Sequence, residues 1–129
     1  MLENAATFSS FSVDDLQRAK DFYNGVLKLA ARETPEGLAL QYPGGGRTFI
    51  YSKKNHEPAT FTVLNFVVDN VDAAVKELKS RGVRFEIYDG PDVKTDEQGV
   101  ARGNGPTIAW FKDPAGNILS VVEEMKNRS

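Results

Sequence analysis

The sequence predicts an α+β fold made of two similar modules that share a sheet, because a strand–helix unit occurs twice. The segment from Phe8 to Leu16 ends in two acidic residues before an amphipathic helix, and the segment from Val63 to Val71 does nearly the same (residue 63 against residue 8, 55 positions apart). The 129-residue chain is long enough for a hydrophobic core without cross-links. We place module one at about 5–53, a polar linker at about 53–60 and module two at about 61–125 within a single domain.

In module one, residues 8–13 alternate as a strand, and Asp14 and Asp15 are residue types that cap helices. The helix that follows carries one apolar stripe at three- and four-residue steps: Leu16, Ala19, Phe22, Tyr23, Val26 and Leu27. Residues 37–42 and 47–52 read as two strands around the Pro43 to Gly46 turn. This turn is not followed by a helix, so it does not predict a phosphate site.

In module two, residues 61–68 form the expected strand, and Asp69 and Asn70 cap a helix that ends at Gly82. Residues 83–88 are predicted as another strand, followed by a long loop over 89–106. Loops of this length in compact domains often act as lids. Residues 107–112 and 118–123 are strands joined by a tight turn from Asp113 to Asn117.

The composition excludes several classes of function. The chain has no cysteine, so it lacks disulfides, thiolate metal sites and a thiol nucleophile. Sixteen basic and 18 acidic residues give a net charge of −2, without the basic patch that nucleic acid requires. No apolar run is long enough to cross a bilayer, and the first residues do not resemble a signal peptide. We therefore expect a cytoplasmic protein that binds neither nucleic acid nor membranes.

The repeated strand–Val-Asp–helix unit, the Asp21 to Tyr23 segment and the closing stretch from Trp110 to Leu119 resemble the vicinal oxygen chelate superfamily. That superfamily includes glyoxalase I, the extradiol dioxygenases, the fosfomycin-resistance thiol transferases and the bleomycin-resistance proteins. The resemblance covers almost the whole chain. It implies two βαβββ modules that form a curled, cup-shaped mixed sheet with helices outside and a ligand inside. Because many members are dimers, it also implies a homodimer.

The resemblance implies a divalent metal with His and Glu ligands in the catalytic members, but those positions are not retained here. The matching positions hold neither imidazole nor carboxylate, and they are Phe8, Ile50 (uncertain by about one residue), Val63 and Ser120. The single histidine, His56, lies in the linker, where we expect a solvated residue. We therefore expect no metal, no other cofactor and no catalytic residue. Serine nucleophiles are also not expected, because no histidine base lies within the pattern.

Strand alternation predicts which side chains line the cup. The predicted ligand-binding residues are mainly apolar, with a few neutral polar groups that would orient a ligand: Phe8, Ser10, Ile50, Val63, Asn65, Ile108, Trp110 and Ser120. Such a lining suits a hydrophobic or aromatic small molecule. The alternative is that the same residues fill the cup as a second core. Arg102 and Lys94 are candidates to meet an anionic ligand, on the basis of their position in the loop alone.

Three hypotheses follow from this lining. The first is a metal-free protein that binds a hydrophobic or aromatic molecule, as the bleomycin-resistance branch does. The second is a lyase, isomerase or dioxygenase that has a non-standard metal site or uses Tyr51, Asn65 or Glu123 for acid–base catalysis. The third is a structural or interaction subunit whose cup is filled.

Overall fold

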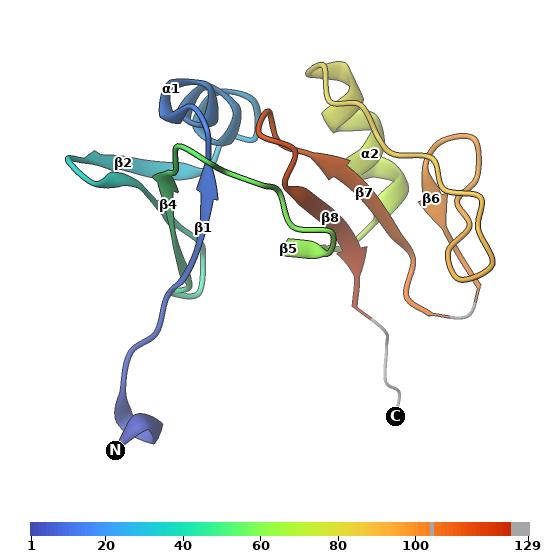
Figure 1. Ribbon diagram of the computed structural model, residues 1–129. Coiled ribbons are helices and arrows are strands. Elements are labelled where there is room, and N and C mark those ends of the chain that lie inside the picture. The colour runs from blue at the N-terminus through green and yellow to red at the C-terminus, as the bar shows by residue number, and fades with distance from the viewer. Residues whose placement is uncertain (104, 125–129) are drawn as a thin grey trace. The chain divides into compact units, whose positions relative to one another are not determined.

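The computed structural model describes residues 1–103 and 105–124, and these residues form two compact units. The first unit is Met1–Pro58 and the second is Ala59–Ser129. Their boundary falls inside the segment predicted as the linker. Each unit contains a helix and a four-stranded mixed sheet (Figure 1), so the predicted α+β class and two-module organisation are confirmed.

The first unit opens with a short 3₁₀ turn, η1 (Leu2–Asn4), and continues through β1 (Ser9–Val13), α1 (Leu16–Lys20) and a π-helical segment, η2 (Asp21–Val26). The strands β2 (Ala30–Thr34), β3 (Gly37–Gln41) and β4 (Arg47–Ser52) follow. The sheet order is β1-β4-β3-β2. The pair β1·β4 is parallel and the other two pairs are antiparallel.

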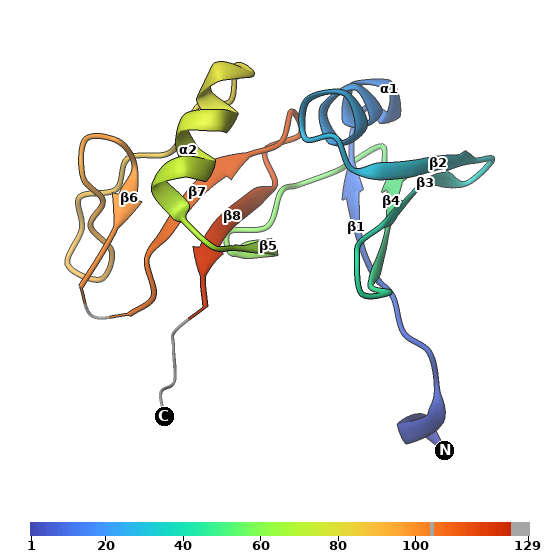
Figure 2. The same ribbon diagram turned by 180° about the vertical axis from the view of Figure 1, so that it is seen from behind.

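The second unit repeats this order with β5 (Thr62–Val68), α2 (Val71–Ser80), β6 (Val100–Ala101), β7 (Ile108–Lys112) and β8 (Ile118–Glu123). Its sheet order is β5-β8-β7-β6, again with a parallel pair between the first and last strands of the unit. Figure 2 shows α2 beside β7 and β8, and α1 beside the sheet of its own unit.

Local hydrogen bonds set both helix starts as the sequence predicts. The Asp15 carboxylate accepts a bond from the Arg18 amide at 3.1 Å, and the Asn70 side chain accepts one from the Ala73 amide at 2.9 Å. These bonds satisfy amide groups that the first helical turn leaves without a partner. The Glu123 carboxylate, at the end of β8, also accepts a bond from the Val71 amide at 2.8 Å. Glu123 therefore ties α2 to the sheet.

The core of each unit lies between its helix and one face of its sheet. In the first unit, the buried side chains include Val13, Ala19, Tyr23, Leu38, Leu40 and Ile50; in the second they include Val71, Val75, Ala109, Phe111, Leu119 and Val121. Two residues of the apolar stripe predicted for the first helix, Ala19 and Tyr23, are almost fully buried in this core. Burial of these side chains is the main source of stability in a domain of this kind.

The structure differs from the prediction at two elements. The edge strand β2 was not predicted from the residues, because its exposed positions carry charged side chains such as Arg32 and Glu33. Residues 83–88 were predicted as a strand but make only an isolated bridge between Phe85 and Phe111. The Tyr88 amide there donates to the Thr95 hydroxyl at 2.8 Å instead of to a neighbouring strand. Because the Glu86 amide also donates to the Trp110 carbonyl oxygen of β7 at 2.8 Å, the segment is held partly by β7 and partly by its own loop.

Gly37 and Gly25 give a matched test of how closely the first sheet is packed. An added Cβ at Gly37 would lie 2.2 Å from the Ile50 carbonyl oxygen, whereas one at Gly25 would meet nothing within 4 Å. We expect Gly37→Ala to lower the free energy of unfolding by at least about 2 kcal/mol, because backbone must move. Gly25→Ala should leave it unchanged or raise it by up to about 1 kcal/mol. Urea denaturation measures both, and equal effects of the two variants would contradict this account.

Candidate functional site

Strand register divides each sheet into a face that packs on the helix and a face that points away from it, here called the helix-distal face. In the first unit, Phe11, Ile50 and Leu38 lie in one row across β1, β4 and β3. Leu38 and Ile50 are buried, and α1 contacts both β3 and β4, so this row faces the helix. The next row, Ser10 and Phe49 with Ala39, therefore lies on the helix-distal face.

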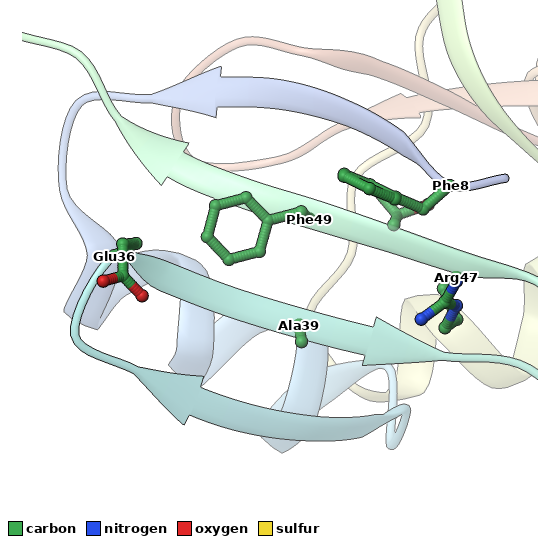
Figure 3. Close-up of a pocket in the computed structure, with 6 residues that line it drawn as sticks. Phe8, Glu36, Ala39, Arg47 and Phe49 are labelled. Carbon is green, nitrogen blue, oxygen red and sulfur yellow. The ribbon is translucent and has the colours of Figure 1, made fainter.

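A cavity of about 310 Å³ lies over the helix-distal face of the first sheet. We call it the first-sheet cavity, and its lining is mainly apolar: Phe8, Glu36, Ala39, Arg47, Thr48 and Phe49. Figure 3 shows the Phe49 ring in the middle, Glu36 at one end, and Phe8 with Arg47 at the other. The Arg47 guanidinium carbon lies 6.0 Å from the centre of the Phe8 ring, within range of a cation–π contact.

Two small residues of β3 make room for this cavity. Ala39 lies directly opposite Phe49 on the neighbouring strand and adds only a methyl group to the cavity floor. A Cβ at Gly37 would lie 2.9 Å from the tip of the Phe49 ring, so the ring occupies the place of a side chain there. The aromatic wall therefore depends on the absence of larger side chains on β3.

The prediction that Ile50 lines the ligand site is wrong, because Ile50 is fully buried on the face that packs on α1. Its neighbour Phe49 lines the cavity instead. A shift of one residue along a strand moves a side chain to the opposite face, and the alignment of β4 was uncertain by one position. Phe8, another predicted ligand-binding residue, lines the first-sheet cavity and is 62% exposed. Ser10 lies in the row of Phe49 and Ala39 but is not among the lining residues.

His56 is half-buried and hydrogen-bonded, which corrects the expectation of a solvated linker residue. Its Nδ1 lies 2.7 Å from the Ser12 hydroxyl oxygen. Ser12 is opposite Tyr51 in the sheet, two residues along each strand from the Ser10–Phe49 pair, so all four lie on the helix-distal face. The sequence pattern gave no histidine partner for these serines, because 44 residues separate His56 from Ser12.

In the second unit, three predicted residues lie in a single row. Asn65, Ser120 and Trp110 are neighbours across β5, β8 and β7. The buried residues Leu119, Val121, Ala109 and Phe111 take the alternate positions on β8 and β7. Since α2 contacts both strands, the row with Trp110 belongs to the helix-distal face of the second sheet. Val63 lies at a register irregularity between Thr62 and Leu64, so it has no direct partner on β8.

The polar atoms of this row are bonded to one another. The Ser120 hydroxyl donates to the Asn65 side-chain oxygen at 2.5 Å, and the Trp110 indole nitrogen donates to the Thr62 hydroxyl at 3.0 Å. The Tyr88 ring meets the Trp110 ring edge-on, with centres 5.5 Å apart. Burial, with a smaller effect of the Glu86 charge, raises the pKa of the Tyr88 hydroxyl. Trp110 is therefore held in place from two sides.

Ile108 and Trp110 also line a second cavity, of about 380 Å³, between β7 and the loop after residue 90. Its other lining residues come from that loop and from the segment beside β6: Pro91, Asp92, Val93, Lys94, Ala101, Arg102, Gly105 and Pro106. Arg102 forms ion pairs with Asp72 at 2.6 Å and with Asp96 at 3.4 Å. The hydrogen bond from Arg102 is the main cause that lowers the pKa of the Asp72 carboxyl. The Arg102 guanidinium is therefore already bound by two carboxylates of its own unit.

The donor set of the described chain does not fit the metal of the catalytic members. Within residues 1–103 and 105–124, no three His, Asp or Glu side chains come together in a way that would hold a metal ion. Of the four matching positions, Phe8 and Val63 are apolar, Ile50 is in the core and the Ser120 hydroxyl is bonded to Asn65. In the same part of the chain, no helix is long and apolar enough to cross a membrane.

Comparisons with known proteins give one family. Residues 7–121 match the model of the Glyoxalase/Bleomycin resistance protein/Dioxygenase superfamily. A lactoylglutathione lyase of Escherichia coli is 27% identical over an alignment 126 residues long, and the match covers 87% of this chain and 87% of that protein. An antibiotic binding protein from Streptomyces has a TM-score of 0.65 at 24% identity, covering 95% of this chain and 98% of that one. A fosfomycin resistance protein from Listeria monocytogenes has a TM-score of 0.68 at 14% identity, covering 95% and 94%.

The loop beside the second cavity supplies a pH-dependent test. Asp96 accepts bonds from the amides of Val100 at 3.0 Å and Gln98 at 2.8 Å, and the Val100 bond is the main reason that its carboxyl pKa lies below 3.8. The ionised form thus stabilises the fold above pH 3.8, and this contribution is lost as the pH falls through the lower pKa of the folded state. We expect Asp96→Asn to be less stable than the wild type at neutral pH.

Thermal denaturation from pH 7 downward measures this difference, which should shrink at acidic pH. Asp92→Asn is the control, because Asp92 is an exposed residue of the same loop and the substitution removes the same charge. A constant difference between wild type and Asp96→Asn at every pH would contradict the assignment.

Proposed function

Because the chain belongs to the Glyoxalase/Bleomycin resistance protein/Dioxygenase superfamily, we propose that it binds a hydrophobic or aromatic small molecule without a resident metal. The observation that carries this proposal is the first-sheet cavity, in which Phe8, Ala39 and Phe49 form an apolar wall. Its volume of about 310 Å³ lies at the lower end of the range for small-molecule sites. The fold is shared with an antibiotic binding protein, which gives this function a precedent.

The chemistry of the cavity favours binding over catalysis. Phe8 and Phe49 offer flat apolar surface that gains free energy when it stacks on a ring and loses water. The positions that hold the metal in the catalytic members supply no imidazole or carboxylate. A protein with this lining would retain a ligand unchanged.

We also propose that the chain forms a homodimer. The second unit leaves several large apolar side chains exposed, among them Phe61 at 67%, Val67 at 63% and Ile87 at 58%. Exposed apolar surface is a common feature of subunit contacts. Light scattering at several protein concentrations tests this, and a strictly monomeric mass would exclude it.

A lyase is the second candidate, and the identity of 27% with a lactoylglutathione lyase favours it. The two candidates differ in metal content. We expect elemental analysis to find no stoichiometric zinc, nickel, iron or manganese after incubation with each metal, because the described donor set does not form a site. Stoichiometric metal together with turnover of lactoylglutathione would replace the binding proposal by the lyase.

A flat neutral probe tests the binding site directly. We expect 2-naphthamide to bind the wild type in isothermal titration calorimetry and Phe49→Ala to weaken the affinity about three- to tenfold, since one aromatic contact is lost. Phe61→Ala is the control, because Phe61 is exposed and lies outside the cavity lining. Circular dichroism verifies that both variants fold. An unchanged affinity in folded Phe49→Ala would place the site elsewhere, and no binding of any aromatic probe would favour a structural subunit.

A further inference from the structure

We propose that the ligand of the first-sheet cavity is an aromatic acid, whose carboxylate is bound by Arg47 with Arg32 beside it. This inference rests on the proposed function and narrows the class of ligand. It follows from where two arginines lie on the helix-distal face of the first sheet and from the charges around them.

The register puts both arginines on the same face as the cavity. Arg32 on β2 lies opposite Ala39, which lines the cavity. Arg47 on β4 lies opposite Gln41, two residues along β3 from Ala39. Glu33, the neighbour of Arg32, forms an ion pair with Lys20 of α1, so Glu33 belongs to the helix side and Arg32 to the other side.

Neither arginine is neutralised within the part of the chain that the structure describes. The ion pairs recorded for residues 1–103 and 105–124 join other side chains, and none includes Arg32 or Arg47. Arg102 in the second unit differs from these two arginines, because it forms ion pairs with both Asp72 and Asp96. The first-sheet face therefore carries two cations that are open to an anion from solution.

The geometry of Arg47 suits recognition of a carboxylate next to a ring. Its guanidinium carbon lies 6.0 Å from the centre of the Phe8 ring, so the cation sits at the edge of the aromatic wall. A planar guanidinium binds a carboxylate through two parallel hydrogen bonds, which gives direction as well as affinity. A ring that stacks along Phe49 would bring an attached carboxylate to this end of the cavity (Figure 3).

Glu36 favours one orientation of the ligand in the cavity. It is the acidic residue among those that line the cavity, and it lies at the end away from Arg47. A carboxylate at that end would be repelled, whereas a neutral or hydrogen-bond-donating group would be tolerated. The cavity thus distinguishes the two ends of its ligand, with the acid toward Arg47 and the uncharged end toward Glu36.

The experiment compares two probes of the same shape, 2-naphthoate and the neutral 2-naphthamide, by isothermal titration calorimetry at low salt. We expect the naphthoate to bind about tenfold more tightly, because a charge-assisted bond to Arg47 is added to the same ring contact. Arg47→Gln should abolish this preference by weakening 2-naphthoate far more than 2-naphthamide, and Arg32→Gln should reduce the preference. High salt should lower the ratio of the affinities for 2-naphthoate and 2-naphthamide, because it screens the charge of Arg47.

Arg18→Gln is the matched control, because it removes the same charge from an exposed position on α1, which packs on the other face of the sheet. An equal loss of preference in Arg18→Gln and Arg47→Gln would show general attraction by net charge and would overturn the inference. Equal affinity of the two probes in the wild type, with Phe49→Ala still weakening both, would overturn the inference but keep the proposed function. Binding of neither probe would overturn both.

Discussion

The parallel pairing of the first and last strands in each unit is the constraint on which the rest of the structure depends. Parallel neighbours require the chain to return to the same end of the sheet before the second strand begins. In each unit a helix follows the first strand and packs on one face of the sheet. The other face is left to side chains that do not belong to this core. Both candidate cavities border strands that expose such a face.

The two helix-distal faces have different chemistry, although the units share a topology. On the second sheet, Asn65 bonds to Ser120 and Trp110 bonds to Thr62, so the polar atoms of the face largely satisfy one another. On the first sheet, Arg32 and Arg47 lie beside an aromatic wall without a recorded carboxylate partner in the described residues. Internal pairing makes the second face a fixed surface, whereas the first offers charge to a ligand.

His56 shows how a residue without a sequence motif gains a defined place. The turn after β4 brings it to Ser12, and the resulting hydrogen bond joins the linker to β1. A lone imidazole beside a hydroxyl does not reproduce the His and Glu set of the metal-dependent members. It does add a hydrogen-bonding group beside Ser12, which lies on the same face as Phe49.

The sequence alone determined the features that depend on neighbours along the chain. The caps at Asp15 and Asn70, the left-handed Gly82 and the turn from Asp113 to Asn117 form through bonds across two to four residues. The repeat could also be read from the sequence, because in both copies a strand is followed by a helix that packs on the sheet and needs apolar residues at matching positions. The alternation on β5, β7 and β8 was correct for Asn65, Trp110 and Ser120, since a continuous apolar face marks the core side there.

Only the tertiary structure decided the features that depend on register and on distant partners. A shift of one residue in the alignment of β4 places Phe49 in the cavity instead of Ile50, and local strand propensity does not distinguish the two alignments. The strand β2 forms on the edge of β3, and residues 83–88 meet β7 at a single bridge while the Tyr88 amide donates to the Thr95 hydroxyl. The meeting of Arg47 with Phe8 likewise requires β1 and β4 to lie side by side, although their partnered residues Ser9 and Thr48 are 39 positions apart in the sequence.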